Sequence, residues 1–449
     1  MHTQHELAGP LPVRRAALVD VYRALRILVA YLILVRVFGT MIKTPLTQYY
    51  FLYVGLPLLF LEIGFGVFYV LDRLLVHKGK FNVYEFVIIT LYAYMMLQGG
   101  LAPYFFYGQP ILTGMTTYKF WGMIWDGLIV FYLLRIRFLD LTIIRDALLF
   151  GAWFQLPIFL LLIFTLNPSQ YAGTLFVYCN EAKGGCQFEF EIFFFLFASI
   201  YYYIRLIKTN KLHYGLFFLI FFSYIFFINQ KRGVSLSLLA TVGLYSLFHM
   251  SRDKLIYYSL LALLAVSILI TALYLFYPEV LQRIVNTYTN AFMAIMGERT
   301  GEASADARIR QGLIAMKYLD RYPLGWIFGN GKLDTDWEGT PVDFLRFYAS
   351  DLGVFGVIFQ YGIMGWLVGL SLMFLFALRN HQRVKWHRNE SFYVAVVYFI
   401  LFLFIRGIPT GGSFFDPGSA TTATFVGIHY FFYYAELHPE RGYKTPLTA

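Results

Sequence analysis

The sequence predicts an all-α fold, a polytopic bundle of transmembrane helices with one large loop outside the membrane. Hydrophobic residues make up 59% of the chain and charged residues 14%, against roughly 45–50% and about 25% in soluble proteins. The apolar residues gather in long runs, and a single long polar segment separates residues 277 and 351. These observations indicate one integral membrane domain over residues 1–449, with residues 278–350 as a large external loop.

About twelve segments meet the requirement for a membrane-spanning helix, which is about 20 mostly apolar residues. No internal repeat and no low-complexity linker divides them into separate units. We predict spans at residues 24–41, 49–71, 83–99, 119–136, 147–165, 189–207, 213–229, 234–249, 255–277, 351–378, 391–406 and 421–436.

Basic residues fill every second connector between these spans. Cytoplasmic connectors carry an excess of lysine and arginine, whereas loops longer than about 60 residues hardly count. Both termini are therefore predicted to be cytoplasmic and the long loop external, and the net charge of +10 reflects this bias rather than nucleic-acid binding. The cations that set this orientation are Arg14, Arg15, Arg23, Arg73, Lys78, Lys80, Arg135, Arg137, Arg145, Arg205, Lys208, Lys211, Arg252, Lys254, Arg379, Arg383, Lys385 and Arg388.

The chain has only two cysteines, Cys179 and Cys186, and both lie in the external connector after the fifth predicted span. Outside the cytoplasm, such a pair can form a disulfide. A free pair is the alternative.

Lys231 and Arg232 interrupt an apolar stretch where two predicted spans meet with almost no loop between them. A cation at membrane depth is costly and usually has a partner or a task. Arg232, with Lys231, either binds a phosphate or snorkels to lipid headgroups.

The external loop is predicted to contain an amphipathic helix over residues 303–320, lying against the membrane or the bundle. Its apolar residues at helical spacing are Ile309, Leu313, Met316 and Leu319. The helix is followed by a turn-rich segment with Gly325, Gly329 and Gly331, where the backbone can closely approach a ligand or a neighbouring helix. The acidic residues after it, Asp334, Asp336, Glu338 and Asp343, either hold a metal or form a solvated surface. Their spacing matches no calcium loop, which favours the solvated surface.

Arg308 and Arg310 lie on this helix, and Asp351 lies where the loop returns to the membrane. Two residues apart on a helix, the arginines point about 200° apart, so only one of them can face a given ligand. Guanidinium groups suit phosphate or diphosphate. Asp351 is a candidate general base for a sugar hydroxyl, and its alternative role is a helix N-cap, shared with Ser350.

Arg36, Glu62 and Asp126 fall inside predicted spans, where charges are expensive. We favour ion pairing that holds the bundle together over proton coupling. His429, in the last span, is interpreted as a hydrogen-bonded core residue.

Three segments together resemble the O-antigen polymerase and O-antigen ligase superfamily (Wzy and WaaL type). The stretch that starts at Lys231 is similar to the Ser-Arg-Gly start of a span in that family. Residues 307–331 resemble the arginine and glycine segment of its periplasmic loop, and Asp351 with Gly362–Gly365 resembles the segment that ends this loop. The segments come in the family's order and cover about a third of the chain. Where ligases carry a histidine, this chain has Asp351, which favours a polymerase.

The resemblance implies a multi-pass bacterial inner-membrane glycosyltransferase with a periplasmic site. It would transfer a glycan from undecaprenyl diphosphate to a lipid-linked acceptor with inversion and without metal or cofactor. Asp351, Arg232 and Arg308 would be catalytic. The residues expected to bind diphosphate or glycan are Lys231, Arg310, Arg321, Arg346 and Arg406. The expected partners are the lipid-linked glycan, the bilayer and a chain-length regulator.

Other functions stay open at this point. A ligase that passes the glycan to a lipid A core or a protein uses the same chemistry. A transporter or flippase also fits twelve spans, although paired halves with matching broken helices are not visible in the sequence. A peptidoglycan glycosyltransferase is a third alternative, but its usual ten spans and loop sequences are not evident.

Overall fold

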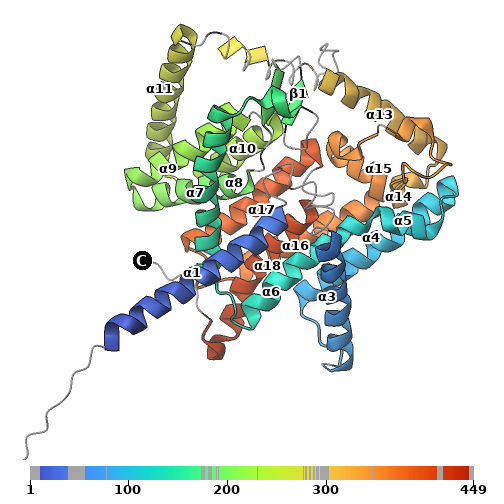
Figure 1. The fold of residues 1–449 in the computed structure, drawn as a ribbon, viewed down its shortest axis with the longest axis horizontal. Helices are drawn as coiled ribbons and strands as arrows, with labels where there is room; N and C mark the ends of the chain where they lie inside the picture. The colour runs from blue at the N-terminus through green and yellow to red at the C-terminus, as the bar shows by residue number, and fades with distance from the viewer. Residues whose placement is uncertain are drawn as a thin grey trace, which may run out of the picture.

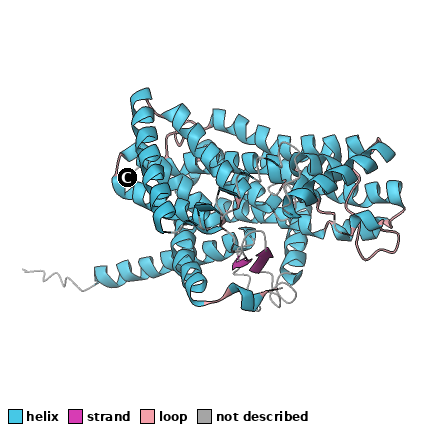
Figure 2. Ribbon diagram, turned by 90° about the horizontal axis from the view of Figure 1, so that it is seen from above, coloured by secondary structure: helices cyan, strands magenta, loops and turns pink. Residues whose placement is uncertain are grey.

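The computed structural model describes residues 11–38, 56–76, 78–172, 177–180, 185–188, 190, 192–229, 231–276, isolated positions between 278 and 293, 303–345, 347–411 and 418–443. Helices make up most of this part of the chain, and its strands form one two-stranded hairpin (Figures 1 and 2).

The first half of the described chain contains six α-helices and one 3₁₀ segment. They are α1 (Leu11–Phe38), α3 (Leu56–Leu75), α4 (Val83–Tyr107), α5 (Ile111–Thr117), η2 (Lys119–Ile124), α6 (Trp125–Arg135) and α7 (Leu141–Thr165). The predicted span at 119–136 is therefore not a single α-helix, because its first six residues adopt the tighter 3₁₀ form. Gly122 in this segment packs directly against Ile63 of α3.

A short 3₁₀ segment, η3 (Pro168–Tyr171), and the hairpin of β1 (Val177–Asn180) and β2 (Gly185–Phe188) lead into the next group of helices. These are α8 (Phe193–Thr209), α9 (Leu212–Ser223), the π-helical η5 (Tyr224–Asn229), α10 (Arg232–His249) and α11 (Arg252–Phe276). In Figure 1, α11 stands at the edge of the molecule.

The last part begins with the polar segment, which holds α13 (Ala303–Arg321), α14 (Gly325–Phe328), η6 (Val342–Phe344) and η7 (Ala349–Leu352). Three apolar helical stretches follow, formed by α15 (Gly353–Gly365), η8 (Trp366–Ser371), α16 (Leu372–Arg383), α17 (Ser391–Thr410) and α18 (Gly418–Leu437), and the short η9 (Pro439–Arg441) ends the described chain.

Among the described residues, four helical stretches are long and apolar enough to cross a membrane. They are Val83–Tyr107, Leu141–Thr165, Ala349–Arg383 and Ser391–Pro409, and two shorter apolar helices are Leu212–Ile228 and Gly233–His249. The chain is thus an all-α protein with membrane-spanning helices. The count of twelve spans and the side on which the polar segment lies stay predictions.

The core is built around α18, which packs against α1, α6, α16 and α17. Its residues from Ser419 to Phe432 are buried. Glycine allows α6 to come very close, since a Cβ at Gly127 would lie 2.9 Å from the backbone of Ala423. Tyr84 of α4 reaches the same place and donates a hydrogen bond to the Ala423 carbonyl at 2.9 Å.

A buried charge cluster ties α3, α4 and α6 together at the start of α4. Glu85 forms a capping box with Asn82, which fixes the beginning of α4. The same carboxylate accepts hydrogen bonds from Arg73 at 2.9 Å, from Arg135 at 3.2 Å and from the Tyr69 hydroxyl. Glu85 therefore both fixes the start of α4 and binds an arginine of each neighbouring helix, α3 and α6.

Candidate functional site

Lys231 and Arg232 lie at the same end of the bundle as Arg406. Helix α9 runs antiparallel to α8, because Tyr224 contacts Phe195 while Tyr214 contacts Tyr202. The start of α10 therefore lies near the start of α8. There, the guanidinium carbon of Arg406 stands 5.0 Å from the ring centre of Phe193.

Asp351 joins them at this end. The turn η7 packs against α17, and a Cβ at Gly353 would lie 2.2 Å from the Ile408 carbonyl oxygen near the end of α17. We name this region the Asp351 end of the bundle and define it by the backbone of Arg232 and by Arg308, Asp351 and Arg406.

The structure separates Arg308 from Arg310. Helix α13 contacts η7, with Gly312 beside Leu352. Arg308 is close enough to Asp351 for the two charges to interact, and both side chains are exposed. Arg310 is exposed too but is not among the groups that act on Asp351. Of the two divergent arginines, Arg308 is thus the one within electrostatic reach of the carboxylate.

Asp351 does not cap a helix with its side chain. Its backbone N–H donates to the Tyr348 carbonyl at 3.0 Å. The N-cap residue of α15 is Leu352, which makes no side-chain capping bond, and η7 likewise has none. The Asp351 carboxylate therefore does not serve as a helix N-cap, which was the structural alternative to its role as a general base.

The other cations that were predicted to bind diphosphate or glycan do not all lie close to Asp351. Arg321 lies thirteen residues from Arg308 on α13, about 20 Å along the helix axis, and its guanidinium stands over Tyr322 at 5.3 Å. Lys231 is the N-cap residue of α10. Arg346 lies outside the described residues, and for Arg232 only the backbone is described.

Helix α13 is present as predicted, but it docks on the bundle by a different face. Its buried residues are Gln311, Ala315, Tyr318 and Leu319, whereas Leu313 is 68% and Met316 41% exposed. The reason is that Tyr318 packs its ring on Phe344 with a 4.6 Å centroid distance. An apolar pattern alone does not identify this aromatic contact.

An ion pair fixes α13 to the segment that follows it. Lys317 lies 2.7 Å from Asp343, and Tyr318 donates to the same carboxylate at 3.3 Å. The Lys317 ammonium and this hydroxyl lower the pKa of Asp343. Asp343 was expected to be part of a solvated acidic surface, and among the described residues no group of three potential metal ligands comes together.

The glycine-rich segment after α13 closely approaches a neighbouring helix. This is one of the two alternatives that the sequence left open, the other being close approach to a ligand. Helix α15 is broken at Gly362, which has φ 73° and ψ 174°. The break frees backbone carbonyls, and the N–H groups of Asn330 and Gly331 donate to Phe359 at 2.7 Å and Gln360 at 3.0 Å. A Cβ at Gly362 would lie 2.1 Å from the Ile327 carbonyl oxygen, so only glycine fits.

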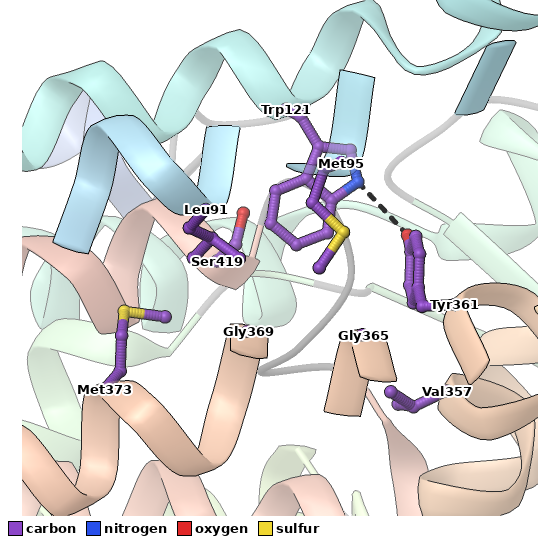
Figure 3. Close-up of a pocket in the computed structure, with 9 residues that line it drawn as sticks. All are labelled: Leu91, Met95, Trp121, Val357, Tyr361, Gly365, Gly369, Met373 and Ser419. Carbon is purple, nitrogen blue, oxygen red and sulfur yellow. Dashed lines mark hydrogen bonds between the residues drawn. The ribbon is translucent and has the colours of Figure 1, made fainter. Parts of the chain in front are cut away.

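A set of buried polar side chains supports this break, and sequence reasoning missed it. Gln98 donates to the Gln360 carbonyl at 2.7 Å, and Gln360 in turn donates to Tyr361 at 3.1 Å. Figure 3 shows Trp121 donating to the Tyr361 hydroxyl at 3.1 Å, across a crevice too narrow to admit water. The sequence contained one sign of this arrangement, the amide side chain of Gln98 inside an apolar span. A buried amide costs free energy unless it forms hydrogen bonds, so a partner for Gln98 could have been expected.

Of the intramembrane charges, Arg36 and Glu62 pair as expected, because Arg36 binds both carboxylate oxygens of Glu62, at 2.8 and 3.0 Å. Asp126 is buried close to them but is in none of the ion pairs found among the described residues. His429 is 1% exposed and hydrogen bonds to Tyr393 at 3.0 Å, so it is a core residue.

Cys179 and Cys186 are joined by a disulfide and face each other across the β1–β2 hairpin. Phe188 and Phe190, which lead from this hairpin into α8, stack on each other, and Phe190 stacks on Phe159. Because α8 begins beside Arg406, the hairpin lies at the Asp351 end of the bundle.

No protein-family model matches this sequence, and no curated protein matches it significantly. What the chain does is therefore inferred from the residues at the Asp351 end.

Proposed function

We propose that the chain is a bacterial inner-membrane polymerase that transfers an undecaprenyl-diphosphate-linked glycan to a lipid-linked acceptor repeat unit. The observation that carries this proposal is that Arg308, an exposed cation, lies within electrostatic reach of Asp351, an exposed carboxylate that caps no helix. The resemblance of the surrounding segments to the polymerase and ligase superfamily supports it.

In the proposed reaction, Asp351 accepts the proton of an acceptor sugar hydroxyl. The hydroxyl oxygen forms a bond to the anomeric carbon of the donor glycan from the face opposite the leaving group. The bond between that carbon and the diphosphate oxygen breaks, and undecaprenyl diphosphate leaves with the electron pair. Arg308, together with Arg232, offsets the negative charge that develops on the diphosphate.

The disulfide supports a periplasmic position of this site. Disulfides persist outside the cytoplasm and are rare within it, and the Cys179–Cys186 bond lies at the Asp351 end. The proposed orientation, with both termini cytoplasmic, agrees with the basic connectors at the other end.

The test compares variants of the purified full-length protein. Wild type, Arg308→Ala, Asp351→Ala, Arg232→Ala and Arg310→Ala are incubated with the host's undecaprenyl-diphosphate repeat unit, and products are separated on a gel. Arg310→Ala is the matched control, because it removes the same exposed group from the same helix. We expect product ladders from wild type and Arg310→Ala, and a loss of roughly 100-fold or more with Arg308→Ala and Asp351→Ala.

Other outcomes assign other functions. Product that forms only when a lipid A core or a protein acceptor is added identifies a ligase. An equal loss with Arg310→Ala contradicts the role given to Arg308. If no glycan is transferred either with the repeat unit alone or with an added acceptor, the proposed glycosyltransferase activity is contradicted.

A transporter or flippase is the second candidate, and the break of α15 at Gly362 favours it. Discontinuous helices with buried polar neighbours commonly form substrate sites in transporters. For a flippase, Asp351→Ala cells would accumulate repeat units on the inner leaflet, whereas a defective polymerase would leave them unpolymerised on the outer leaflet.

A further inference from the structure

An open groove of about 750 Å³ lies at the opposite end of the bundle from Asp351. It is formed where α16 and α18 end, at the far end of the candidate span Ala349–Arg383. The lining side chains used below are Arg383, Lys385, Trp386, Tyr433 and Leu437. The volume is in the range of small-molecule sites, roughly 300–1,000 Å³.

Glu436 holds the groove in shape. Its carboxylate accepts the backbone N–H groups of Lys385 at 2.9 Å, Trp386 at 2.8 Å and His387 at 3.1 Å. The connector after α16 is thereby fixed over the last turns of α18. The acidic group in the lining is thus engaged by the backbone.

The two cations of the groove are available to an anion. Within the described part of the chain, neither Arg383 nor Lys385 forms an ion pair, and both are exposed. The guanidinium carbon of Arg383 stands 5.8 Å from the ring centre of Tyr433, a cation–π contact that orients it.

Apolar groups complete the groove. Trp386 is 70% and Leu437 52% exposed. Tryptophan and tyrosine beside lysine and arginine at the ends of apolar helices are typical of the membrane interface. A free phosphate needs the cations but gains nothing from these apolar surfaces, whereas a lipid uses both.

We propose that this groove binds the headgroup of an anionic phospholipid. Its phosphate lies between Arg383 and Lys385, and its glycerol backbone and first acyl carbons lie against Trp386 and Leu437. This site is separate from the Asp351 end and does not depend on the proposed glycosyl transfer.

The experiment measures binding of dioctanoyl phosphatidylglycerol to the full-length protein in uncharged detergent by native mass spectrometry. The groove variant Arg383→Gln/Lys385→Gln is compared with Arg252→Gln/Arg388→Gln, which removes two exposed cations at the same end that do not line the groove. We expect the groove variant to bind about 30-fold more weakly, since each of the two cations contributes about fivefold, and the control to bind like wild type.

Two further probes separate the sources of the anion. Dioctanoyl phosphatidylcholine should bind weakly to all variants. Inorganic phosphate should not compete with phosphatidylglycerol at equal concentration, and full competition would overturn the lipid assignment. Equal weakening in the groove and control variants would overturn the site. Trp386→Ala keeps all charges of the groove. This single substitution should weaken the binding of phosphatidylglycerol and leave the binding of inorganic phosphate unchanged.

Discussion

Replacing Glu85 by glutamine tests the buried charge cluster that joins α3, α4 and α6. The carboxylate side chain is 1% exposed, and its partners Arg73 and Arg135 are 9% and 19% exposed. Glutamine keeps the size of the side chain and can still accept the Asn82 N–H in the capping box. It removes the one carboxylate that forms ion pairs with both arginines among the described residues.

The expected cost follows from the burial. Removing one partner of a buried ion pair costs about 3–5 kcal/mol, because the remaining charge stays out of water without compensation. Two arginines lose their partner here. Among the described residues, the Arg73 guanidinium keeps hydrogen bonds to the Tyr69 hydroxyl alone, from Nη2 at 3.0 Å and from Nε at 3.3 Å. We therefore expect Glu85→Gln to lower the free energy of unfolding by at least about 3 kcal/mol.

The assay is reversible unfolding in mixed micelles by sodium dodecyl sulfate, followed by circular dichroism. Asp146→Asn is the matched control, since Asp146 also pairs with two arginines, but its partner Arg23 is 55% exposed. An exposed pair contributes about 1 kcal/mol or less. Equal losses in the two variants would refute the argument that burial of Glu85 makes the cluster stabilising.

Three further predictions address other parts of the fold. Gly362→Ala should destabilise the protein by about 3 kcal/mol or more, because it adds a Cβ at positive φ against a backbone carbonyl. The control is Gly243→Ala in α10, where the space around the glycine is open. This variant should have equal or higher stability in the same unfolding assay. The pKa of Asp343 is lowered by Lys317, so this pair stabilises α13 above the ordinary carboxyl pKa of 3.8 and ceases to do so as the pH falls through the lowered value. The amide protection factors of α13, which correct for the slower chemical exchange in acid, should therefore fall on acidification in wild type and not in Asp343→Asn. Burial raises the pKa of Glu390, and the imidazole of His387, 3.7 Å away, opposes this. Ionised Glu390 therefore costs stability, and Glu390→Gln should raise the Tm at neutral pH but not well below pH 4.5, where the Glu390 side chain is protonated in both the folded and the unfolded state.

Local properties of the sequence determined the class of the protein. Long apolar runs identify membrane-spanning helices because hydrocarbon excludes unbonded backbone and charge. The helix at Ala303–Arg321 was evident from its composition and spacing, and Cys179 and Cys186 could be assigned to one connector. Intramembrane charges could be expected to pair because each is too costly alone, as Arg36 and Glu62 do.

Which distant residues meet was decided only by tertiary structure. The spacing of Arg308 and Arg310 showed that they diverge but not which one faces Asp351, because that depends on how α13 rotates on the bundle. The rotation is set by the packing of Tyr318 on Phe344, from a segment more than twenty residues away. Hydropathy and periodicity describe each helix by itself, whereas the site arises from contacts between helices, which the order of residues within one helix does not specify.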